Sequence, residues 1–180
     1  MENTLNKIQK LAKAGLIISK IILYCCCVGL FCCVLVLISR KNVVLLENIA
    51  FGNATNIKEA ISIGDYYCST TTGIIMCIME IILSVLSIKF FKKELEIGTP
   101  FNLEITKQMK KLGIRFIYVP LIAIITSSIA HECFSHYYEG VKEIDFSNST
   151  SIDLGLAFLV ISLICKYGAQ LIEERTKPNE

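Results

Sequence analysis

Hydrophobic residues gather in four long runs that are separated by polar segments. The first run, residues 21–38, contains no charge, and the second, residues 70–91, has Glu80 near its middle. A third run covers roughly residues 112–130, and a fourth continues from about residue 152 through Lys166 to residue 172. Since about 20 apolar residues in a helix cross a bilayer, the pattern predicts transmembrane helices at approximately 16–39, 70–91, 112–130 and 152–172.

The composition supports an all-α polytopic membrane protein made of a single unit, residues 1–180. Hydrophobic residues make up 53% of the chain and the mean hydropathy is +0.58, which is too apolar for an ordinary soluble domain. The net charge of +2 gives no indication of nucleic-acid binding. Seven of the nine cysteines lie inside the apolar runs, where we interpret them as small packing residues.

The positions of lysine and arginine predict the orientation. Of the eighteen Lys and Arg residues, fourteen fall in the N-terminal segment, in residues 89–115 and from Lys166 onward. Basic segments stay on the cytoplasmic side of a membrane. We therefore expect a four-helix bundle with both termini in the cytoplasm.

The basic segment 92–115 should form a cytoplasmic hairpin between the second and third helices. Asn102 is suited to cap a basic helix with Ile105, Met109 and Leu112 on one face. Within the third span, Pro120 predicts a kink. A second short amphipathic helix is expected to begin after Asn56, outside the membrane.

Glu80 is the candidate intramembrane acid, since its place in the second run puts it near the middle of the bilayer. A charge there costs about 2.5–3.5 kcal/mol on insertion scales. It could serve as a proton or cation site, or it could be a neutral carboxyl that joins helices by a hydrogen bond. Candidate partners are Tyr118 and Thr126 in the third span and Ser162 in the fourth.

The remaining candidate chemistry lies at the predicted outer ends of the helices. Cys68 and Cys133, the two cysteines outside the apolar runs, could form a disulfide or stay as two thiols. His131 and His136 flank Cys133 but are five residues apart, so they do not converge on one helix face. We interpret them as polar interface residues and expect no metal site, no cofactor and no enzymatic activity.

Two short motifs resemble a known family. Gly98-Thr99-Pro100-Phe101-Asn102, with the basic helix that follows, and the closing segment that includes Gly168, Leu171 and Glu174 are similar to domain of unknown function family 2975. The resemblance implies four helices in a bacterial cytoplasmic membrane, no established activity and a gene pairing with a small helix-turn-helix regulator.

Two functions follow as hypotheses. The first is regulation or sensing, with Gly98, Pro100 and Phe101 as a docking motif for a cytosolic partner; a turn that redirects the chain explains the same residues. The second is a small-solute or proton-coupled ion carrier that uses Glu80 and would need to form a homo-oligomer. Both place the protein in the lipid bilayer.

Overall fold

Four α-helices make up the part of the chain that the structure describes. This computed structural model describes residues 2–38, 63–99, 101–138, 141 and 150–176. The helices are α1 (Glu2–Ile38), α3 (Ile63–Ile97), α4 (Leu103–Tyr137) and α5 (Thr150–Thr176). Each has a stretch long and apolar enough to cross a membrane. The predicted all-α fold with four membrane-spanning helices is therefore confirmed.

The helices continue well beyond their apolar runs. α1 begins at Glu2, so the basic N-terminal segment forms the first turns of the same helix. α4 joins the predicted basic helix and the third apolar run in 35 residues and passes through Pro120 without being divided. Lys, Glu and Gln are good helix formers, so a helix that leaves hydrocarbon at such residues has no local reason to stop. The kink at Pro120 stays a prediction.

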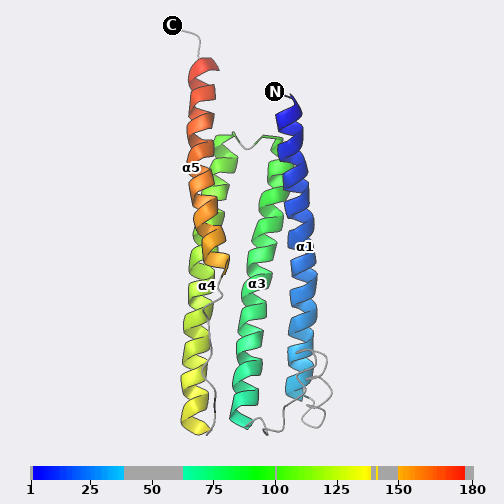
Figure 1. Ribbon diagram of the computed structural model, residues 1–180, viewed down its shortest axis with the longest axis vertical. Coiled ribbons are helices and arrows are strands. Elements are labelled where there is room, and N and C mark those ends of the chain that lie inside the picture. The colour runs from blue at the N-terminus through cyan, green and yellow to red at the C-terminus, as the bar shows by residue number, and fades with distance from the viewer. Residues whose placement is uncertain (1, 39–62, 100, 139–140, 142–149, 177–180) are drawn as a thin grey trace.

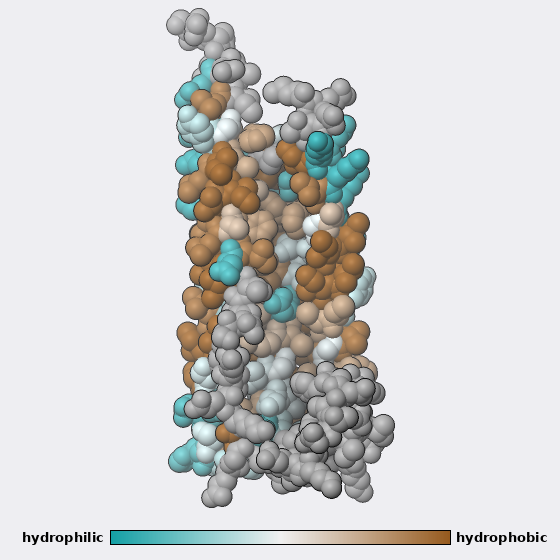
Figure 2. All heavy atoms as spheres, in the orientation of Figure 1, coloured by the Kyte–Doolittle hydropathy of each residue, from teal (hydrophilic) through white to brown (hydrophobic). Residues whose placement is uncertain are grey.

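The bundle is built from antiparallel neighbours. α1 packs against α3, α3 against α4, and α4 against α5. Figure 1 shows both termini and the α3–α4 connection at one end of the bundle. Figure 2 shows apolar side chains over the middle of the visible face, with hydrophilic residues gathered toward both ends. This surface fits a protein that is solvated by lipid at its middle.

The core consists of two clusters centred on α3 and α4. One, Met79, Leu83 and Ala123, joins these two helices. The other adds α5 and contains Phe90, Ile105, Met109, Leu112 and Cys165. Ring contacts extend this second cluster, since Phe158 of α5 lies 6.1 Å from Phe90 and 5.8 Å from Phe116 between centroids. α1 lies outside both clusters and exposes much of its apolar surface.

α5 is displaced along the bundle axis toward the end that holds the termini. Gly155 near its start lies against Gly113, and Gly168 lies against Phe101, just before α4 begins. In Figure 1, α5 accordingly starts partway along α4 and extends past the α3–α4 connection. Ser162, a predicted partner of Glu80, falls between these two glycine contacts. Its hydroxyl donates to the Leu159 carbonyl at 2.7 Å.

Two sequence predictions fall on residues outside the described part of the chain. They are the short amphipathic helix after Asn56 and the position of Pro100.

Candidate functional site

The connection between α3 and α4 is a compact turn fixed by backbone hydrogen bonds. α3 ends at Ile97, and Gly98 follows with a φ of 78° in the left-handed region. The Gly98 N–H donates to the Glu94 carbonyl at 2.9 Å. Glycine adopts this conformation without the steric cost of a Cβ. The Gln9 side chain donates to the Gly98 carbonyl at 3.5 Å, so the start of α1 is attached to the same turn.

Polar side chains then start α4. The Asn102 Oδ1 accepts from the Glu104 N–H at 2.7 Å, which confirms the predicted N-cap. The Thr99 hydroxyl accepts from the Phe101 N–H at 3.3 Å. Across the turn, the Lys93 ammonium pairs with the Glu104 carboxylate. Interactions at the end of α3, within the turn and at the start of α4 therefore fix its conformation.

The structure brings the two motifs together. A Cβ built on Gly168 would lie 2.8 Å from Cδ1 of Phe101, so the ring packs directly on the α5 backbone at a position that only glycine leaves open. Phe101 remains 39% exposed. Leu171 and Glu174 follow Gly168 along α5 and are exposed. Phe101 and Gly168 thus form one surface, which we call the turn face.

The surroundings of the turn face are rich in lysine and also include the exposed carboxylates Glu96 and Glu104. Four exposed lysines lie on the last turns of α3 and the first turns of α4, namely Lys92, Lys107, Lys110 and Lys111. A buried carboxyl, Glu94, lies in a narrow recess between α1 and α3 that Ala12 and Gln9 also line. The turn face therefore combines an aromatic ring with a helix backbone, and exposed lysines lie on the helices beside it.

A second candidate region is the α1–α3 interface, to which α1 contributes small residues. On α1, Ala12, Ser19, Cys26 and Cys33 follow one another at seven-residue intervals. On α3, the positions that meet α1 include Tyr66, Gly73, Glu80 and Glu94, which lie at multiples of seven. Small side chains let helix backbones approach closely. This heptad spacing was visible in the sequence and would have predicted both the pairing and the inward position of Glu94.

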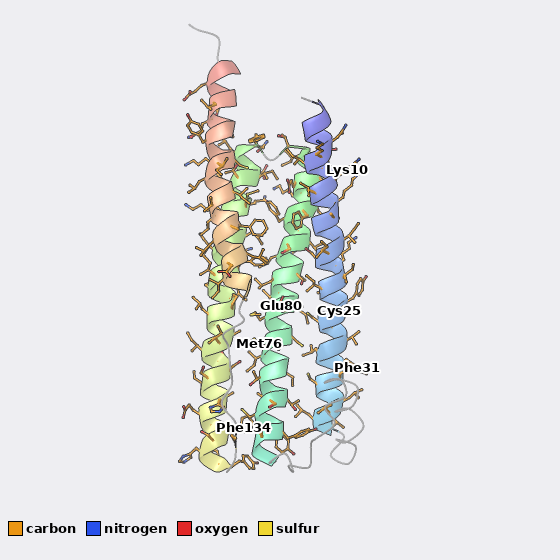
Figure 3. The ribbon with its side chains drawn as sticks, viewed as in Figure 1. Lys10, Cys25, Phe31, Met76, Glu80 and Phe134 are labelled. Carbon is orange, nitrogen blue, oxygen red and sulfur yellow. The ribbon has the colours of Figure 1, made fainter. Side chains whose placement is uncertain are left out.

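Glu80 lies on the face of α3 that meets α1. It is half-buried and within electrostatic range of Cys26 and Cys77. Figure 3 places Glu80 at nearly the height of Cys25 of α1, between Lys10 near one end of the bundle and Phe134 near the other.

Tyr118 and Thr126 are the two α4 residues expected to bond to Glu80. The Thr126 hydroxyl donates to the Ile122 carbonyl at 2.8 Å, and Tyr118 is exposed. A hydrogen bond between Glu80 and either residue stays a prediction.

The outer-end candidates occupy different environments. Cys68 is buried and Cys133 is exposed. Whether the two form a disulfide or stay as two thiols remains a prediction. The His136 ring packs on Tyr137 with centroids 5.4 Å apart. Within the described residues, no group of three or more His, Cys, Asp or Glu side chains is arranged to hold a metal ion.

Comparison of the chain with family models, curated proteins and solved structures gave no match. The similarity to family 2975 therefore depends on the quoted motif residues alone. The structure adds that two of these residues, Phe101 and Gly168, are in contact.

Proposed function

We propose that this protein is a membrane-anchored regulatory or sensing protein that binds a cytosolic partner through its turn face. The observation that carries the proposal is the contact between Phe101 and Gly168. It joins segments 67 residues apart into one surface at the end of the bundle where both termini lie. Because this surface is assembled from the turn before α4 and from α5, its shape depends on the relative positions of these two helices.

The chemistry of the turn face suits a partner with an acidic surface. Phe101 offers partly exposed aromatic area, and aromatic residues are frequent anchors at interfaces. The exposed lysines around it, Lys92, Lys107, Lys110 and Lys111, would steer an acidic protein toward it by long-range attraction.

The positive charge also supports a cytoplasmic location for this end of the bundle. On that basis we place the protein in a cell membrane with both termini inside, and the family resemblance suggests a bacterial cytoplasmic membrane. A small helix-turn-helix regulator is the partner that the resemblance favours. Such a partner, and not this chain, would contact DNA.

The carrier hypothesis has a single favourable observation, the position of Glu80 at an interhelical interface. Glu80 lies on the face of α3 that meets α1, within electrostatic range of Cys26. A path for a solute would require α1 to move away from α3 or a second copy of the chain to complete it. We therefore favour the regulatory function.

Site-specific photocrosslinking in intact cells tests the proposal. A photoreactive side chain at Leu103, which is 36% exposed beside the turn face, should give an adduct with a soluble protein. The matched control is Ile122, which is 57% exposed on the apolar middle of α4 and should give no such adduct.

The same adduct should be reduced in a Gly168→Leu background, because the larger side chain displaces Phe101. An adduct that is equally strong in that background would show that the turn face is not the binding surface. Absence of any soluble adduct at Leu103, with solute flux in proteoliposomes, would favour the carrier.

A further inference from the structure

Two thiols of the α1–α3 interface lie against each other. The Cys77 sulfur packs over Gly29, where an added Cβ would lie 3.4 Å from it, and the Cys33 sulfur packs over Gly73 at 3.5 Å. The Cys33 and Cys77 thiols also lie within electrostatic range of each other. Each cysteine therefore lies over a glycine of the opposite helix and beside the other cysteine.

The sequence explains this reciprocal arrangement. Each glycine precedes a cysteine by four residues, since Gly29 precedes Cys33 and Gly73 precedes Cys77. Residues four apart share a helix face, and the two helices are antiparallel neighbours. Each sulfur lies at van der Waals distance from the position that a Cβ on the opposite glycine would occupy. A disulfide requires Cα atoms within about 7 Å, which close helix approach favours.

The other cysteines of α1 are less well placed to react with Cys77. Cys25 and Cys27 are exposed. Cys26 lies within electrostatic range of Cys77, but among the described α1 cysteines only Cys33 has its sulfur over a glycine of α3, Gly73. Cys33 is therefore the preferred partner.

We infer that Cys33 and Cys77 are a redox-active pair that closes to a disulfide between α1 and α3, with a lipid-soluble quinone as the oxidant. Both S–H bonds break and one S–S bond forms. The two electrons and two protons released reduce the quinone to its hydroquinone.

A quinone suits the position of the pair. Both cysteines lie in the apolar runs of their helices and are half-buried, so one side of the pair faces the lipid. A hydrophobic two-electron oxidant dissolves at that depth, whereas charged aqueous oxidants are excluded from hydrocarbon. The bond would fix α1 to α3, and the Gln9 contact to Gly98 connects the same two helices at the turn. This inference does not depend on the proposed partner.

Thiol counting on the full chain in proteoliposomes tests the pair. The protein, reduced first, is treated with decylubiquinone, denatured and alkylated, and its mass gives the number of free thiols. Oxidation should lower the count by two from the nine cysteines of the chain. Peptide mapping should show Cys33 linked to Cys77, and dithiothreitol should restore all thiols.

Three serine variants give the controls. Cys33→Ser and Cys77→Ser should lose no thiols to the quinone, whereas Cys27→Ser, at an exposed position on α1, should still lose two. The inference is overturned if the wild-type count stays at nine. It is also overturned if mapping shows another linked pair, such as Cys26 with Cys77 or Cys68 with Cys133. Mapping of the wild type decides the matter even if a serine variant does not fold.

Discussion

The ring of Phe101 lies on the backbone of Gly168, so close that a methyl group on Gly168 would lie 2.8 Å from Cδ1 of the ring. Phe101 belongs to the turn between α3 and α4, and Gly168 belongs to the second half of α5. The contact therefore ties the end of α5 to the turn. It also explains why a glycine stands in a helix where alanine would be favoured by about 1 kcal/mol.

Gly168→Ala should release the end of α5 from the turn. The added methyl displaces the ring, so amide hydrogen exchange should become faster at residues 168–174. Global stability should change by less than about 1 kcal/mol, because only the far end of one flexible side chain must move. In a Phe101→Ala background the same substitution should instead slow exchange, since the clash is absent and alanine stabilises the helix relative to glycine. Equal effects in both backgrounds would contradict the contact.

Gly155→Ala should weaken the packing of α4 against α5. Its Cβ would lie 2.9 Å from the Gly113 carbonyl oxygen and 2.8 Å from Ile117, and a backbone atom cannot move aside cheaply. Overpacking of this kind costs about 1–3 kcal/mol, measurable by unfolding in mixed detergent micelles. Gly73→Ala is the matched control, because its Cβ meets only the Cys33 sulfur at 3.5 Å. Equal losses of stability for both variants would contradict the close approach of α4 and α5.

Asn102→Ala should destabilise the first turn of α4. The variant removes the acceptor that satisfies the Glu104 N–H, and loss of an N-cap costs about 1 kcal/mol. Asn102→Asp should retain the cap. Hydrogen exchange at residues 103–106 should therefore be faster in the alanine variant alone, and slow exchange there would show that the cap is dispensable.

Labelling of intact cells should report the orientation through a native thiol. Cys133 is exposed near the end of α4 farthest from the termini, so a membrane-impermeant maleimide should modify it from outside. Cys133→Ser should remove the label, and a thiol introduced by Lys110→Cys in that background should be protected until the cells are opened. Labelling at position 110 in intact cells would invert the topology and exclude a cytosolic partner at the turn face.

Glu80→Gln should leave the fold intact, because glutamine keeps the volume of the side chain and can still donate and accept hydrogen bonds. Unfolding midpoints should match the wild type. Glu80→Lys is the contrasting variant, since a charge held at this depth costs about 2.5–3.5 kcal/mol. If Glu80→Gln abolished a proton-driven flux in proteoliposomes while remaining folded, the carrier function would replace the regulatory one.

Much of the fold follows from local features of the chain. The four apolar runs, the absence of charge in residues 21–38 and the polar segments between the runs predict the helices in α1, α3, α4 and α5. The sequence predicts the N-cap at Asn102, because capping depends only on a side chain and on a backbone N–H two residues away. Helix ends were less predictable, since hydropathy indicates where a helix leaves the hydrocarbon core of the bilayer and not where the helix itself ends.

The sequence by itself determined that this chain has four helices able to cross a membrane and that its positive charge is concentrated in particular segments. Only the tertiary structure decided how far α5 is displaced along α4, that Phe101 meets Gly168, and that Glu80 and Cys77 face α1. The physical reason is that helix register depends on the fit of side chains and glycine gaps that are distant in sequence. Hydropathy records the affinity of each residue for lipid, but it holds no information about which gap a given side chain fills.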